Sequence, residues 1–109
     1  MNLFHTTDAD GISELNPSAD KMRELLDSLQ DPEVLETEHP DVALVHDATG
    51  WALTAYPNGV VTLENFDHED ESPLYMKGMS RNQILELWLE LSRGEIQQLR
   101  ARSWQREDS

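Results

Sequence analysis

The sequence contains no cysteine, which excludes disulfide bonds, thiolate metal sites and cysteine nucleophiles. Basic residues are few, with 8 lysines and arginines against 22 aspartates and glutamates. The resulting net charge of −14 disfavours a nucleic-acid partner, because a phosphate backbone repels a negative surface. Apolar runs are short, and none approaches the roughly 18 residues that a membrane-spanning helix needs. We therefore expect neither a nucleic-acid nor a membrane partner.

Signatures of catalysis are missing as well. The five glycines are isolated, and the chain has no nucleophile elbow, phosphate-binding loop or dinucleotide fingerprint. The four histidines are scattered without the spacing of metal ligands. We expect no enzyme activity, no cofactor and no bound metal. Residues 1–11 show neither the basic nor the apolar segment of a secretory signal, so a cytoplasmic location is expected.

The 109 residues suit one domain with a single core. Within this domain, 1–109, residues 1–15 are polar and weakly patterned, which predicts a loose lead-in with at most a short strand at 3–5. Asn16 and Pro17 predict a helix start, with Asn16 as the N-cap. An apolar stripe at helical spacing follows, formed by Met22, Leu25, Leu26 and Leu29.

Three runs that alternate apolar and polar residues, 41–46, 51–56 and 60–65, predict an antiparallel meander. A three-residue turn at 57–59, with glycine in the left-handed position, places Leu53 opposite Leu63 and sorts apolar from polar side chains. The expected core face has three rungs: Val42/Ala55/Val61, Leu44/Leu53/Leu63 and His46/Trp51/Asn65. The opposite face is small, hydroxylated and only half polar, so it can meet water or a partner. A fourth strand is predicted at 73–79.

A second helix is predicted at 81–93, where Ser80 and Gln83 form a capping box. Its apolar arc is unusually wide because Leu85 and Leu89 extend the usual stripe. A short helical arm over 95–104 should return to cover it, and residues 105–109 should be a free tail. The sequence thus predicts an α+β fold: an N-terminal helix, an antiparallel meander of three to four strands, a C-terminal helix and the arm.

Two acidic segments resemble parts of cation-binding loops, but both lack necessary ligands. Asp8 and Asp10 precede Gly11 as in a calcium loop, yet the position of the closing glutamate is occupied by Pro17. The segment 65–71 also lacks the glycine and the closing glutamate. A solvated turn at 8–11 and an exposed acidic loop are the preferred interpretations. His46 is expected to be a hydrogen-bonded residue at the end of the core face, with a functional role as the alternative.

The negative charge is concentrated in one part of the chain. Residues 1–80 carry 17 acidic and three basic side chains, whereas residues 81–109 carry five of each. Such a field accelerates encounter with basic proteins, although acidic surfaces also serve solubility. We expect a basic protein partner. The residues expected to bind it lie in the connector before the meander and in the following acidic loop: Glu36, Glu38, Asp41, Asp67, Glu69, Asp70 and Glu71.

The order of elements resembles that of the small acidic immunity proteins of bacterial polymorphic-toxin systems. The likeness is greatest at Leu91-Ser92-Arg93-Gly94-Glu95, followed by Trp104. The resemblance implies a cytosolic protein that binds and blocks a cognate toxin, often a basic nuclease or deaminase. It transfers no individual binding residue to this chain.

A different hypothesis is a structural or accessory domain that forms a homodimer. The surfaces suited to self-association are the wide apolar face of the helix at 81–93 and the small-residue face of the sheet. The three tryptophans, Trp51, Trp88 and Trp104, are expected to be core anchors, with an interface role for one of them as the alternative.

Overall fold

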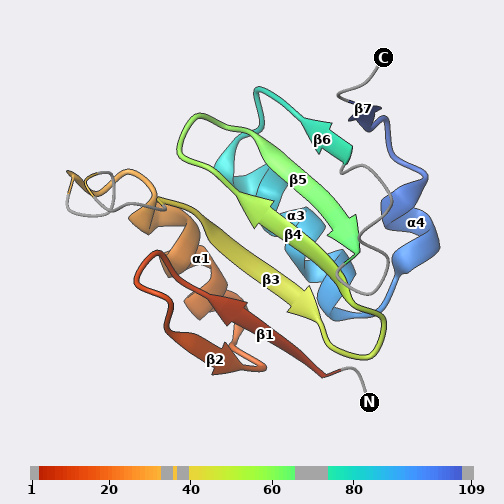
Figure 1. Ribbon diagram of the computed structural model, residues 1–109, viewed down its shortest axis with the longest axis horizontal. Helices are drawn as coiled ribbons and strands as arrows, with labels where there is room; N and C mark the ends of the chain where they lie inside the picture. Colours follow the sequence, from red (N-terminus) through yellow and green to blue (C-terminus); the bar gives the residue numbers. More distant parts are fainter. Residues whose placement is uncertain (1–2, 33–35, 37–39, 66–73, 107–109) are drawn as a thin grey trace.

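The computed structural model describes residues 3–32, 36, 40–65 and 74–106. It shows an α+β fold with one antiparallel sheet in the order β2-β1-β3-β4-β5-β6-β7, and with α1 and α3 behind it (Figure 1). The strands are β1 (Phe4–Thr7), β2 (Ser13–Leu15), β3 (Val42–His46), β4 (Trp51–Ala55), β5 (Val61–Asn65), β6 (Leu74–Met76) and β7 (Gln105–Arg106). The helices are α1 (Ala19–Ser28), α3 (Arg81–Ser92) and α4 (Ile96–Arg100). Within the described ranges, no helix has both the length and the apolar character needed to cross a membrane.

The predicted meander is confirmed, including its register. Leu53 pairs with Leu44 on one side and with Leu63 on the other, and Trp51 pairs with Asn65. Gly59 has a φ of 81°, the left-handed conformation that the three-residue turn requires. The predicted fourth strand is present as the shorter β6, so the alternation of apolar residues located this half of the sheet correctly.

The expectation of a loose lead-in is wrong for residues 4–15, which form a β-hairpin. Its first strand, β1, lies between β2 and β3, and the buried Thr6 pairs with Leu44. The side chain of Asp8 stabilises the turn by accepting N–H bonds from Asp10 and Ile12 at 3.0 and 2.9 Å. The hairpin adds two strands to the predicted sheet, and β7 brings the strands among the described residues to seven rather than three or four.

The start of the first helix is also corrected. Asn16 does not cap α1, because its backbone N–H and its Oδ1 bond Phe4 at 2.8 and 3.0 Å and close the hairpin. Asn16 adopts a φ of 47°, a left-handed conformation that asparagine tolerates. The N-cap is Ser18, whose hydroxyl accepts the N–H of Lys21 at 3.2 Å. The chain thus turns from strand to helix two residues later than predicted.

Both amphipathic helices bury the predicted residues against the sheet. The four residues of the α1 stripe are at most 9% exposed. Helix α3 has the predicted capping box between Ser80 and Gln83. Leu85 is buried and Leu89 packs against the core, because α3 contacts α1, the sheet and α4. The wide apolar arc is therefore covered within the chain.

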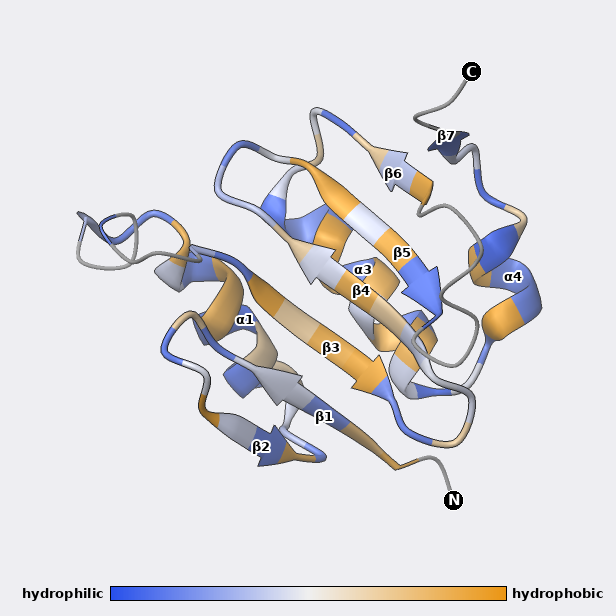
Figure 2. Ribbon diagram, in the orientation of Figure 1, coloured by the Kyte–Doolittle hydropathy of each residue, from blue (hydrophilic) through white to orange (hydrophobic). Residues whose placement is uncertain are grey.

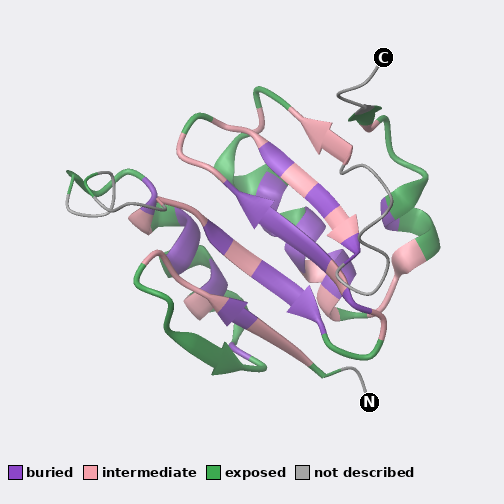
Figure 3. Ribbon diagram, viewed as in Figure 1, coloured by how far each residue is buried: buried purple, intermediate pink, exposed green. Residues whose placement is uncertain are grey.

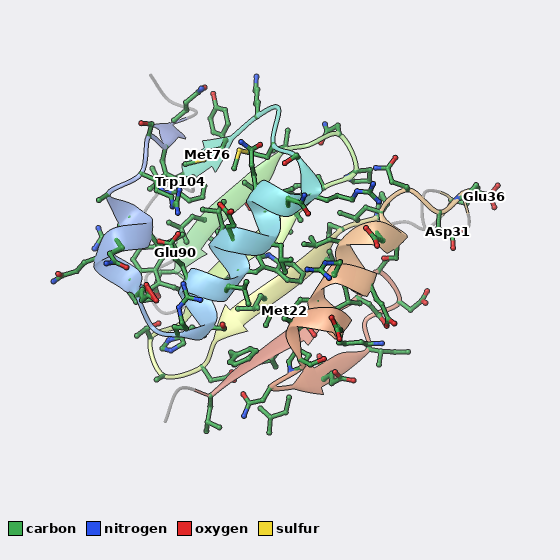
Figure 4. All side chains as sticks on the ribbon, turned by 180° about the vertical axis from the view of Figure 1, so that it is seen from behind. Met22, Asp31, Glu36, Met76, Glu90 and Trp104 are labelled. Atoms are coloured by element: carbon green, nitrogen blue, oxygen red, sulfur yellow. The ribbon has the colours of Figure 1, made fainter. Side chains whose placement is uncertain are left out.

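The C-terminal arm returns to the core as predicted, but the tail does not start at residue 105. Leu99 is fully buried, and Trp104 packs against the core while its Nε1 donates to the Leu99 carbonyl at 2.7 Å. Trp104 lies beside Met76 (Figure 4). The next residues, Gln105 and Arg106, pair with β6 as the last strand. This pairing corrects the expectation of a free tail.

Candidate interaction surface

One face of the sheet has no described helix on it, and we call it the open face. The apolar side chains of β3, β4 and β5 that pack with the helices alternate with a second set on the opposite side. Figures 1 and 4, which are opposite views, show α1 and α3 on the same side of the sheet. The register assigns the following residues to the open face: His5, Thr7, Asp41, Ala43, Val45, Ala52, Thr54, Tyr56, Thr62, Glu64 and Tyr75.

The middle of the open face is made of short side chains. Ala52 and Thr54 on β4 are buried, and Ala52 lies between Val45 and Glu64 in the register. Figure 3 shows β4 buried over most of its length, whereas β2 is exposed throughout. Figure 2 shows that hydrophobic and more polar residues alternate along the central strands. Short side chains let a partner approach closely, while the longer polar groups at the ends of the strands determine the charge.

Negative charge on this face affects the pKa of the Tyr56 phenol. Burial raises the pKa of its phenol above 10.0, and the negative charges of Asp41 and Glu64 raise it further. A side-chain hydrogen bond with Thr62 acts in the opposite direction. Asp41 directly precedes β3, where the register extends to place it opposite Tyr56, whereas Glu64 on β5 pairs with Ala52 and acts on the phenol from farther along the sheet. This arrangement favours a cation beside the ring.

Neutralising these carboxylates should lower the pKa of Tyr56. The chain has two tyrosines, so a Tyr75→Phe background leaves Tyr56 as the sole one. In that background Asp41→Asn with Glu64→Gln should shift the ultraviolet tyrosinate titration to lower pH, although burial keeps the pKa above 10.0. The folded state holds the phenol proton more tightly than the unfolded state. The stabilisation that Tyr56 contributes is therefore complete below pH about 10 and is lost as pH rises through the folded pKa. An unchanged titration would contradict the proximity of these charges.

Most of the described basic side chains lie on elements away from the open face. Six of those that the structure describes belong to the helices or the arm: Lys21, Arg23, Arg81, Arg93, Arg100 and Arg102. Several are engaged there, since Arg81 pairs with Asp27 at 2.8 Å and Arg100 lies 4.9 Å from the centre of the Trp51 ring. Lys77 lies nearer the sheet, 5.6 Å from the centre of the Tyr75 ring.

The predicted site residues are only partly described. Asp41 is half-buried at the start of β3, and Glu36 is exposed near Asp31 at one end of the molecule (Figure 4). Glu38 and the loop residues Asp67, Glu69, Asp70 and Glu71 lie outside the described residues. Of the predicted set, only Glu36 and Asp41 are therefore described, and the grouping of the seven acids stays a prediction. The sequence interpretation did not select Tyr56 and Glu64, although the register already assigned both to the face opposite the core.

His46 belongs to a structural cluster at the end of the sheet. It is 2% exposed, and its Nδ1 lies 2.8 Å from the Oγ1 of Thr49. Asn65 donates from Nδ2 to the Thr49 carbonyl at 3.1 Å. These contacts confirm a hydrogen-bonded histidine that closes the loop between β3 and β4. Among the residues that the structure describes, no group of three or more histidine, aspartate or glutamate side chains is placed to hold a metal ion.

Comparison of the chain with models of protein families, with curated proteins and with solved structures gave no match.

Proposed function

We propose that this protein is a small acidic binding module that docks a basic protein, with the open face as the contact surface. The carrying observation is that the negative charges of Asp41 and Glu64, which lie at two places on this face, both raise the pKa of the Tyr56 phenol. A lysine or arginine beside Asp41 would pair with its carboxylate next to the Tyr56 ring, and a second basic side chain would pair with Glu64. The acids predicted at 36–41 and 67–71 would steer the partner towards this face.

The resemblance to immunity proteins suggests a specific form of this proposal, in which the basic partner is a toxin and docking blocks its activity. The distribution of charge supports a one-sided interaction, because all the described arginines except Arg106 in β7 belong to the helices, their ends or the arm. The homodimer alternative loses one of its two surfaces, since Leu85 and Leu89 pack inside the chain. Two open faces of like charge would also repel each other.

Affinity capture with matched variants tests the proposal. The immobilised protein is exposed to lysate of its source organism at about 0.05 and 0.5 M salt, because the higher salt shortens the Debye length severalfold. We expect a basic protein that is retained at low salt and released at high salt. Asp41→Asn with Glu64→Gln should weaken its binding by about tenfold, as expected for the loss of two close charge contacts.

The matched control removes the same charge from the helical side through Glu24→Gln with Glu86→Gln, both at exposed positions. Separate variants neutralise the connector (Glu36, Glu38) and the loop (Asp67, Glu69, Asp70, Glu71). Loss of binding in the loop variant alone would move the contact away from the open face. Salt-independent binding that no variant changes would refute the proposal.

A further inference from the structure

The outer edge of β2 is exposed, and no strand among the described residues pairs with its backbone N–H and C=O groups. All three residues of β2 are exposed, and β2 is the last strand of the sheet on its side. Ile12, just before β2, and Leu15, its last residue, are 65% and 64% exposed, more than Leu3, the other exposed large apolar residue that the structure describes. Exposed strand edges next to apolar side chains are the usual template for adding another strand.

The hydrogen-bond pattern determines which backbone groups face outward. Asn16 N–H bonds the Phe4 carbonyl and Asp8 N–H bonds the Ile12 carbonyl, so the even-numbered positions of β2 face β1. The odd-numbered residues of β1 face β3 instead, as the bond from Asp47 N–H to the Leu3 carbonyl shows. By this alternation, the N–H and C=O groups of Ser13 and Leu15 point away from the sheet.

We infer that an extended basic segment of the partner protein pairs with the β2 edge as an additional strand, an inference that rests on the proposed function. The segment should be basic because residues 8–16, which include β2, contain Asp8, Asp10 and Glu14 and no basic residue. A side chain opposite Glu14 would be lysine or arginine, and one opposite Leu15 would be apolar. A second copy of the chain, with its net charge of −14, is repelled from the same edge.

A defined peptide tests this inference on the full chain by amide hydrogen exchange at low salt. The probe is a capped nine-residue peptide in which lysine alternates with valine or threonine. Excess probe should slow exchange of the Ser13 and Leu15 amides by about tenfold, because ladder bonds protect amides from exchange. Two control peptides, one with glutamate for lysine and one methylated at successive central amide nitrogens, should give no protection.

Variants at Ser13 provide the matched comparison. Ser13→Pro removes the outward N–H at an edge position that tolerates proline, and it should abolish probe binding. Ser13→Ala also loses the 3.0 Å contact with the Thr7 hydroxyl but keeps the N–H, so it should bind normally. Thermal unfolding of both variants shows whether the hairpin persists. If Ser13→Pro unfolds the hairpin, the inference is tested by comparing the lysine peptide with the two control peptides on the unsubstituted protein.

Three outcomes would overturn the inference. They are no binding of the lysine peptide, protection of amides outside β2, and protection of Ser13 and Leu15 that rises with protein concentration without probe. The last would show that a second copy occupies the edge. Each of these outcomes overturns only the pairing at the β2 edge. The proposed function fails separately, when capture of a basic protein does not depend on salt or on Asp41 and Glu64.

Discussion

Leu53→Ala should lower the free energy of unfolding by about 3 kcal/mol, the typical cost of removing a buried leucine side chain. Leu53 is fully buried in the central strand and faces the helices between Leu44 and Leu63. The helices and the neighbouring strands hold its surroundings in place, so the cavity cannot collapse completely. Urea unfolding followed by circular dichroism measures the change.

Thr54→Ala is the matched control, because the neighbouring Thr54 lies on the opposite side of the same strand. Its cost should be about 1 kcal/mol or less if no packed layer covers the open face. Comparable costs at Leu53 and Thr54 would mean that both faces of β4 support a core. The open face would then not be available to a partner.

Arg102→Met should destabilise the protein by about 2 kcal/mol, because it leaves Glu90 buried without its cation. Glu90 lies on α3 (Figure 4) at 7% exposure, and its Oε2 accepts a hydrogen bond from Arg102, which follows α4. The second variant, Glu90→Met with Arg102→Met, should recover much of the lost stability, because it removes the buried charge itself.

A double-mutant cycle on the thermal unfolding of these variants gives the coupling energy between Glu90 and Arg102. A coupling near zero would contradict a structural ion pair. Arg81, which pairs with Asp27 at 2.8 Å where both side chains are more than half exposed, offers a comparison at the surface. Its substitution by methionine should change stability by less than about 1 kcal/mol, since solvent screens the charges.

The sequence identified those elements in which pattern and turn chemistry agree. The stripe of α1, the capping box of α3 and the register around Leu53 were all predicted correctly, because burial on one face forces a single alignment. The hairpin of β1 and β2 was missed because its strands are too short to show alternation. Asp10-Gly11 between Thr6-Thr7 and Ile12-Ser13 was the available signal of a turn between strands.

The candidate surface was less predictable than the fold. Charge counting along the chain selected Asp41 as part of an acidic region, but it could not show that Glu64, more than twenty residues later, also raises the pKa of the Tyr56 phenol. Proximity of this kind depends on the order of strands in the sheet. The edge position of β2 could not be predicted for a similar reason, because the sequence alone does not give the order of strands in the sheet.

The insertion of β1 between β2 and β3 has a consequence for the order of folding. Within the meander, neighbouring strands are joined by short turns, whereas β1 and β3 are separated by the hairpin, α1 and the connector. Closing that longer loop costs more chain entropy, so the meander can form first and the hairpin dock afterwards. In a chain whose hairpin has not yet docked, β3 would present Leu44 and Val45 on an unpaired edge, the kind of edge that favours aggregation.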